Sequence, residues 1–163
     1  MRTYLRHLAQ ALLCCLPVTL LVQQVAGRLP ANAQVHVLDG NFKLISTTEG
    51  IPANIKEAFV RYSRQPSFAM ANPGAKYQVG DVVLDRTLPF RRLVFAGAAD
   101  DRWFIHYERG GRGHGYYVIV FKVNPGTKAQ LLWGGSGGSG ARSLDQLRKM
   151  IADGEISSDG ASY

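Results

Sequence analysis

The chain has 163 residues, 46% of them hydrophobic, and a formal net charge of +7. Its only cysteines, Cys14 and Cys15, both lie in an apolar run near the amino terminus. The rest of the chain therefore has no disulfide, no thiol nucleophile and no cysteine metal ligand. This excludes the small disulfide scaffolds that are common among secreted proteins.

The first 33 residues have the pattern of a secretory signal peptide. Arg2 and Arg6 are positively charged, residues 8–22 are almost wholly apolar, and Ala31-Asn32-Ala33 places small residues where a signal peptidase cleaves. We expect cleavage near Ala33, with a cut after Ala26 as the alternative, and a periplasmic or secreted mature protein. The apolar run is shorter than the roughly 18–20 residues that span a bilayer, so we expect no membrane-spanning segment after cleavage.

Removal of residues 1–33 leaves sixteen basic and twelve acidic residues, a net charge of +4. An exported protein meets little nucleic acid, so acidic proteins, anionic glycans and lipid headgroups are the anionic partners to consider. About 130 residues suffice for one hydrophobic core. We expect a single domain over residues 34–156 and a frayed tail over residues 157–163.

The predicted elements follow in chain order. Residues 35–44 predict a small hairpin around Asp39-Gly40, and residues 52–64 predict a helix with Pro52 at its first position. Five segments rich in aliphatic and aromatic residues then predict strands, over residues 81–85, 91–97, 101–108, 116–123 and 129–133. Their short links favour an antiparallel meander.

Three further segments complete the expected fold. The related stretches 72–79 and 124–131 each contain Asn-Pro-Gly and predict two type II turns, each of which starts a strand. Residues 134–143 are rich in glycine and predict a flexible connector. Ser143, Gln146 and Gly154 then mark the start and end of a closing helix over residues 143–152. We expect a single α+β domain: an antiparallel sheet of about five strands in a meander, packed with two main helices.

The stretch HYERGGRGHGYY, residues 106–117, concentrates the candidate site residues. His106 and Glu108 are two apart on a predicted strand and so point to one face, with His114 in the loop that follows. These three side chains suit a metal site or acid–base chemistry, but their spacing matches no established metal motif. On a half-exposed strand, His106 and Glu108 are more often solvated or paired with a neighbour such as Lys122.

Other catalytic patterns are absent from the sequence. The chain has no Gly-x-Ser-x-Gly nucleophile elbow, because Ser136 and Ser139 sit among glycines that would hold a catalytic serine poorly, and it has no Ser-His-Asp set in a known context. Ala141 and Arg142 stand where a phosphate-binding loop requires Lys and then Ser or Thr. The single Arg-Gly-Gly copy, between two strands of an exported protein, does not indicate RNA binding. We therefore expect no catalytic residue, no metal and no cofactor.

The leading hypothesis is a small exported, non-enzymatic protein that binds another protein of the cell envelope, as an inhibitor, immunity-type factor or accessory subunit. The hairpin supplies the predicted contact residues: Tyr107, Arg109, Arg112, His114 and Tyr116, with His106 and Glu108. Two alternatives stay open. One is a small envelope hydrolase or metal-dependent enzyme that uses His106, Glu108 and His114, and the other is a binder of anionic glycans or lipid headgroups.

Overall fold

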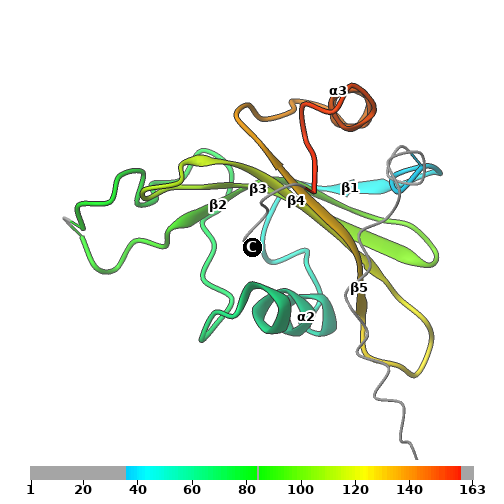
Figure 1. The fold of residues 1–163 in the computed structure, drawn as a ribbon. Helices are drawn as coiled ribbons and strands as arrows, with labels where there is room; N and C mark the ends of the chain where they lie inside the picture. The colour runs from blue at the N-terminus through cyan, green and yellow to red at the C-terminus, as the bar shows by residue number, and fades with distance from the viewer. Residues whose placement is uncertain (1–35, 84, 159–163) are drawn as a thin grey trace, which may run out of the picture.

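The computed structural model describes residues 36–83 and 85–158. It is a single α+β domain in three layers (Figure 1). Helix α2 (Ala53–Ser63) covers one face of a five-stranded antiparallel sheet, and helix α3 (Leu144–Ala152) covers the other. Neither helix within these ranges has the length and apolar character needed to cross a membrane. The predicted signal peptide, residues 1–33, lies outside the described residues.

The five strands lie side by side in chain order, which confirms the predicted meander. They are β1 (Lys43–Ile45), β2 (Arg91–Ala98), β3 (Arg102–Arg109), β4 (Gly115–Lys122) and β5 (Gln130–Gly137). Strands β3 and β4 form the predicted hairpin, with Glu108 opposite Tyr116 and Arg109 opposite Gly115. The pairing of β2 with β3 shifts between Leu93 and Phe95, so both Val94 and Phe95 pack on the α3 side.

The strand predicted over residues 81–85 is wrong. Val82 and Val83 are 67% and 45% exposed and lie in a loop. Their β-branched side chains suit a strand only where a neighbouring strand and a packed layer receive them, and here they face solvent. The fifth strand is β1 instead. The hairpin predicted over residues 35–44 is also not formed: residues 36–38 make a turn and β1 pairs with β2.

Strand β4 is buried on both faces, as its two apolar faces predict. On the α2 side, Tyr117, Ile119 and Phe121 pack with Phe59 of the helix. On the α3 side, Val118 and Val120 pack with a group that includes Leu147. The sheet therefore separates two cores, one under each helix.

Both predicted helices are present. The Ser143 hydroxyl accepts a hydrogen bond from the Gln146 amide at 3.2 Å and caps α3 as expected. The Gln146 side chain accepts from the amide of Arg142, at 2.8 Å, which precedes the cap residue. Pro52 flanks the first turn of α2, and α2 ends at Arg64, whose φ of 53° lies in the left-handed region.

Replacement of Arg64 by glycine is expected to stabilise the protein by up to about 1 kcal/mol. A side chain in the left-handed region costs roughly 1–2 kcal/mol, and part of this gain is offset by the larger chain entropy that glycine has when unfolded. Urea unfolding measures the change, with Gln65→Gly as the matched control, which should destabilise the protein or leave it unchanged. A loss of stability in Arg64→Gly would contradict this account of the end of the helix.

The two Asn-Pro-Gly turns form, but only the second starts a strand. Gly74 and Gly126 have φ values of 76° and 75°, and in each turn the asparagine carbonyl accepts from the amide three residues later. Residues 134–137, predicted as part of a flexible connector, belong to β5. A Cβ on Gly137 would lie 2.4 Å from the Glu155 carbonyl oxygen, so this glycine lets the chain after α3 pack against the strand. Ser157, expected in a frayed tail, exchanges two backbone hydrogen bonds with Ser136.

Candidate functional site

The tip of the β3–β4 hairpin is docked against another part of the chain. The amide of Gly110 donates to the Phe90 carbonyl at 2.9 Å, and the amide of Gly111 donates to the Val79 carbonyl at 2.8 Å. A Cβ on Gly110 would lie only 1.9 Å from the Gln78 carbonyl oxygen. The glycines of the Arg-Gly-Gly sequence therefore allow close packing of two backbones.

The segment that receives the tip is the loop of residues 78–83 and 85–89, here called the docking loop. Its ends meet, because the Gln78 amide donates to the Pro89 carbonyl at 2.9 Å. Inside the loop, the Gln78 side chain donates to the Val82 carbonyl, and Asp85 accepts from the amide and the hydroxyl of Thr87 at 2.8 and 2.6 Å. Compact surface loops with joined ends are frequently functional.

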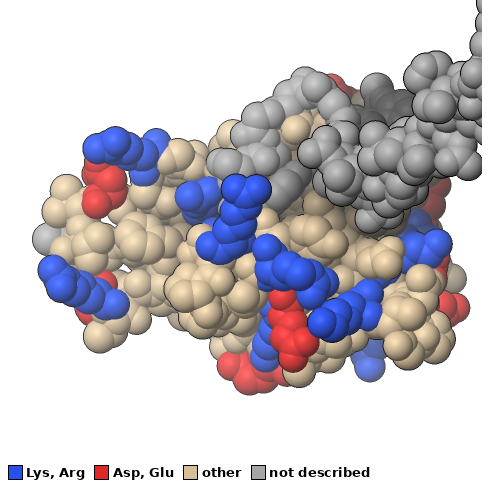
Figure 2. Space-filling model, turned by 60° about the horizontal axis from the view of Figure 1, so that its bottom comes forward, with Lys and Arg blue, Asp and Glu red and all other residues tan. Residues whose placement is uncertain are grey.

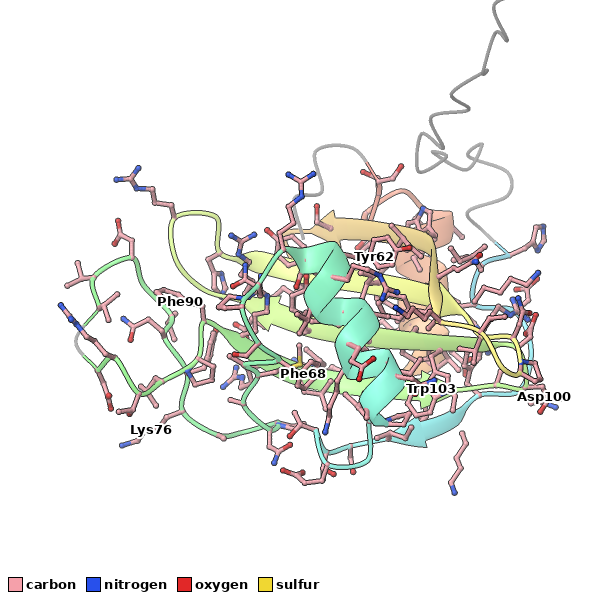
Figure 3. The ribbon with its side chains drawn as sticks, turned by 90° about the horizontal axis from the view of Figure 1, so that it is seen from below. Tyr62, Phe68, Lys76, Phe90, Asp100 and Trp103 are labelled. Atoms are coloured by element: carbon pink, nitrogen blue, oxygen red, sulfur yellow. The ribbon has the colours of Figure 1, made fainter. Side chains whose placement is uncertain are left out.

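The docking loop and its flank expose apolar side chains. Val79, Val82, Val83 and Phe90 are 54%, 67%, 45% and 39% exposed; together they are called the loop surface. Phe90 and Lys76 lie beyond the strand ends, away from Asp100 and Trp103 at the other end (Figure 3). In the space-filling view, this end of the molecule shows uncharged surface between small groups of charged side chains (Figure 2).

Glu108 is the centre of a polar cluster on the α3 side of the hairpin. Its side chain is 7% exposed, and one oxygen accepts from Arg92 Nη2 at 2.6 Å. The other oxygen lies 2.8 Å from His114 Nε2 and 3.4 Å from the Tyr116 hydroxyl. The Tyr77 hydroxyl lies 3.4 Å from the same His114 nitrogen. These contacts join β2, the hairpin and the chain that leads into the docking loop.

The surroundings of Glu108 favour its ionised form. Burial alone would raise its pKa, but hydrogen bonds from Tyr77, His114 and Arg92, together with the positive charge of Arg92, outweigh burial and hold the pKa below the usual value. Burial and the nearby Glu108 charge raise the pKa of both tyrosines, Tyr77 and Tyr116. The cluster is thus a carboxylate surrounded by donors, and it holds together the end of the hairpin next to the tip.

His106 is fully buried, contrary to the expectation of a half-exposed strand. Its Nδ1 donates to the Tyr117 carbonyl at 2.9 Å, and its Nε2 accepts from the Ala141 amide at 3.0 Å. Burial lowers the pKa of His106 from 6.5 to about 4, although the bond to Tyr117 opposes the shift. His106 is therefore a neutral link between β3 and the loop before α3.

The structure brings together only some of the predicted site residues. Glu108, His114 and Tyr116 share one cluster, whereas His106 makes its bonds to backbone atoms. Glu108 pairs with Arg92 and His114; the suggested partner Lys122 lies opposite Arg102, at the other end of the hairpin.

The remaining predicted site residues lie on the α2 side or at the tip. Tyr107 is buried and stacks on Tyr117, with ring centroids 5.4 Å apart. The Arg109 guanidinium lies 6.0 Å from the Tyr117 ring. Arg112 is exposed at the tip. Arg109 and Arg112 are thus the predicted basic residues that border the docking loop.

An open pocket of about 360 Å³ adjoins the Glu108 cluster. Its walls come from three segments: the turn at Pro73 and Gly74, residues 92–94 of β2, and residues 140–142 before α3, with Glu108 and Tyr116 between them. A Cβ on Gly140 would lie 2.4 Å from the Tyr116 ring, so this glycine lets the loop before α3 lie flat on that ring. The loop before α3 therefore forms a wall of the pocket and also bonds to His106 through the Ala141 amide.

The positions of His106, Glu108 and His114 limit the residues that the enzyme alternative could use. In the part of the chain that the structure describes, no group of three His, Cys, Asp or Glu side chains is placed to hold a metal ion. Both ring nitrogens of His106 are engaged, which leaves Glu108 and His114 as the pair that this alternative can use.

Several residues of this end of the molecule were not predicted as site residues. Tyr77 and Arg92 complete the Glu108 cluster, and both reach it through contacts distant in sequence. Val82 and Val83 carry the loop surface but were assigned to a strand. The signal that favours a loop is the surrounding sequence, in which Gly80-Asp81 precedes the valines and Pro89 follows at a short distance.

Comparison of the chain with models of known protein families, with curated proteins and with solved structures finds no match.

Proposed function

We propose that the protein is exported and non-enzymatic, and that it binds a protein partner through the loop surface and the adjoining hairpin tip. The observation that carries this proposal is the exposure of Val79, Val82, Val83 and Phe90 on a loop that is anchored to the hairpin by backbone hydrogen bonds. Exposed apolar side chains contribute to binding when a partner covers them, because burying them releases about 25 cal/mol per Å².

The anchoring makes this surface suitable for recognition. Hydrogen bonds join the ends of the docking loop and fix it to Gly110 and Gly111. A partner therefore does not have to order the loop, and the entropy cost of association is reduced. This is the reason to prefer the loop surface over Leu44, which is 52% exposed but stands alone on the short strand β1.

The charges around the loop surface favour a protein over a membrane or a glycan. Arg86, Arg109 and Arg112 are basic, but the docking loop also carries Asp81 and Asp85. A surface that binds anionic lipid gains about 1 kcal/mol from each Lys or Arg, and nearby carboxylates oppose that gain. An apolar centre with a mixed charged rim is the usual composition of a protein interface.

Among the buried titratable groups, Glu108 and His106 are not suited to acid–base catalysis near neutral pH. A general acid or base works best when its pKa lies near the working pH. The pKa of Glu108 is held below its usual value by its donors, and the pKa of His106 is about 4. Both groups support the architecture of the hairpin instead.

The test is capture of an envelope partner by the immobilised protein. The amount captured by the wild type is compared with the amount captured by the double variant Val82→Asp/Val83→Asp. We expect the variant to lose a discrete partner by at least tenfold, because two charges replace apolar contacts at the centre of the interface. Leu44→Asp is the matched control, since it charges an exposed apolar residue at the other end of the sheet.

Three outcomes would count against the proposal. Equal capture by the wild type and the double variant would remove the loop surface from the interface. Loss of capture in Leu44→Asp alone would place the interface at β1. Retention by anionic lipid vesicles or cell-wall glycan, with no protein captured, would favour the alternative binder.

A further inference from the structure

The outward side of helix α2 carries a group of basic side chains. Lys56 and Arg61 belong to the helix, and Arg64 follows its last turn. Lys128 lies in the turn between β4 and β5, next to the helix, because the Arg61 guanidinium donates to the Ala129 carbonyl at 2.6 Å. These four basic residues are here called the basic face. In the space-filling view, which turns the α2 side toward the reader, Lys and Arg side chains gather around a smaller acidic group (Figure 2).

Neighbouring carboxylates do not neutralise the basic face. None of its four side chains forms an ion pair with an acidic residue that the structure describes, whereas Arg92 and Arg148 each pair with a carboxylate. Residues 53–64 and the turn 124–128 carry these four basic residues and one acidic residue, Glu57, which gives a local net charge of +3. This side of the molecule therefore attracts anions.

Half-buried aromatic rings lie among the basic side chains. Lys56 Nζ lies 5.5 Å from the centre of the Phe68 ring, and the guanidinium carbon of Arg61 lies 5.1 Å from the centre of the Tyr62 ring. Trp103 packs on the same side of the sheet, and all three aromatic residues are partly exposed. Seen from the α2 side, Tyr62, Phe68 and Trp103 surround the helix (Figure 3).

This composition matches the surface of an anionic membrane. Lys and Arg are attracted to lipid phosphates while their apolar stems contact the region below, and Tyr and Trp favour the level of the headgroups. An anionic glycan offers the same charge but no acyl chains for the rings. We propose that the protein docks peripherally on anionic phospholipid through the basic face, with Tyr62, Phe68 and Trp103 at the headgroups. The loop surface consists of other residues, so this interaction does not rest on the proposed function.

Co-sedimentation with vesicles of phosphatidylcholine, with and without phosphatidylglycerol, tests the basic face. We expect the natural protein, as isolated from cells, to bind the anionic vesicles and to leave the neutral ones in solution. Binding should be lost between about 0.1 M and about 1 M salt, because the screening length falls from about 10 Å to about 3 Å. Arg64→Gln/Lys128→Gln should weaken binding about fivefold for each charge removed.

The matched control is Lys122→Gln/Arg142→Gln, which removes the same charge from exposed residues outside the basic face. Lys122 lies on the α3 side of β4, and Arg142 precedes α3. The control should bind anionic vesicles nearly as well as the wild type. Arg64→Gln/Lys128→Gln should still capture the protein partner, which separates this test from that of the loop surface.

Three results would overturn the membrane contact. Equal binding to anionic and neutral vesicles would exclude attraction to the lipid charge. An equal loss of binding in the two double variants would show that net charge, and not the basic face, determines the affinity. Retention on dextran sulfate with no binding to anionic vesicles would assign the basic face to anionic glycans.

Discussion

Gly110→Ala is expected to destabilise the protein by roughly 2–3 kcal/mol, in the upper range of overpacking substitutions. The new Cβ would lie 1.9 Å from the Gln78 carbonyl oxygen and 2.7 Å from that of Val79. Both neighbours are backbone atoms, so no side chain can move aside to relieve the clash. The tip and the docking loop must separate, and the bonds from Gly110 to Phe90 and from Gly111 to Val79 are then lost.

Urea unfolding measures this effect, and Gly113→Ala is its matched control. Gly113 lies in the same hairpin tip, has no positive φ, and a Cβ there would meet no atom within 4 Å. We expect this control to stay within about 0.5 kcal/mol of the wild type, as surface substitutions usually do. Equal unfolding midpoints for the two alanine variants would disprove the close docking of the tip.

Acidification from pH 7 to pH 4 is expected to cost roughly 3 kcal/mol through His106 alone. Folding lowers the pKa of His106 from 6.5 to about 4, chiefly by burial. Between these values the unfolded chain binds a proton and the folded protein does not. The stability that His106 contributes is therefore complete above pH 6.5, decreases as the pH falls, and is lost below about pH 4.

The pH dependence of urea unfolding in His106→Gln isolates this contribution. The variant should be less stable at pH 7, because the ring bonds to Tyr117 and Ala141 are altered, but its stability should fall less between pH 6.5 and pH 4. His36→Gln is the control substitution, since it removes a histidine whose side chain is 73% exposed. Parallel profiles for the wild type and His106→Gln would contradict the buried neutral histidine.

Glu108 adds a separate acid-sensitive contribution at lower pH. Its pKa is lowered in the folded protein, so the stability that it supplies is complete above its unfolded pKa and is lost as the pH falls through the folded value. This loss begins below the usual glutamate pKa of 4.5 and so overlaps the lower end of the His106 window. Stability is therefore expected to go on falling below pH 4, after the contribution of His106 has been lost.

Local patterns predicted the hairpin and the helices but not the environment of their side chains. The alternation in residues 101–108 and 116–123 placed Ile105 and Ile119 in a core, and both are buried. The same alternation left His106 on a half-exposed face. Its burial depends on Ala141, which is 35 residues away in sequence, and no local pattern shows that this loop returns over β3.

Predictions from the composition of short segments were wrong where tertiary packing determines the local structure. Val82 and Val83 have strand composition but face solvent, because the docking loop is closed by its own hydrogen bonds. The glycines at 134–137 were predicted to be part of a flexible connector, whereas Gly137, like Gly110, allows close approach of another backbone. Glycine permits both freedom and close packing, and only the three-dimensional neighbours distinguish them.

Site-specific photo-cross-linking in living cells tests the central claim most directly. A photoreactive amino acid at position 82, within the loop surface, is compared with the same group at position 44 on β1, where Leu44 is also exposed. We predict one discrete protein adduct from position 82 and no such adduct from position 44. Adducts from position 44 with none from position 82, or the same pattern from both, would contradict the assignment of the docking loop as the binding surface.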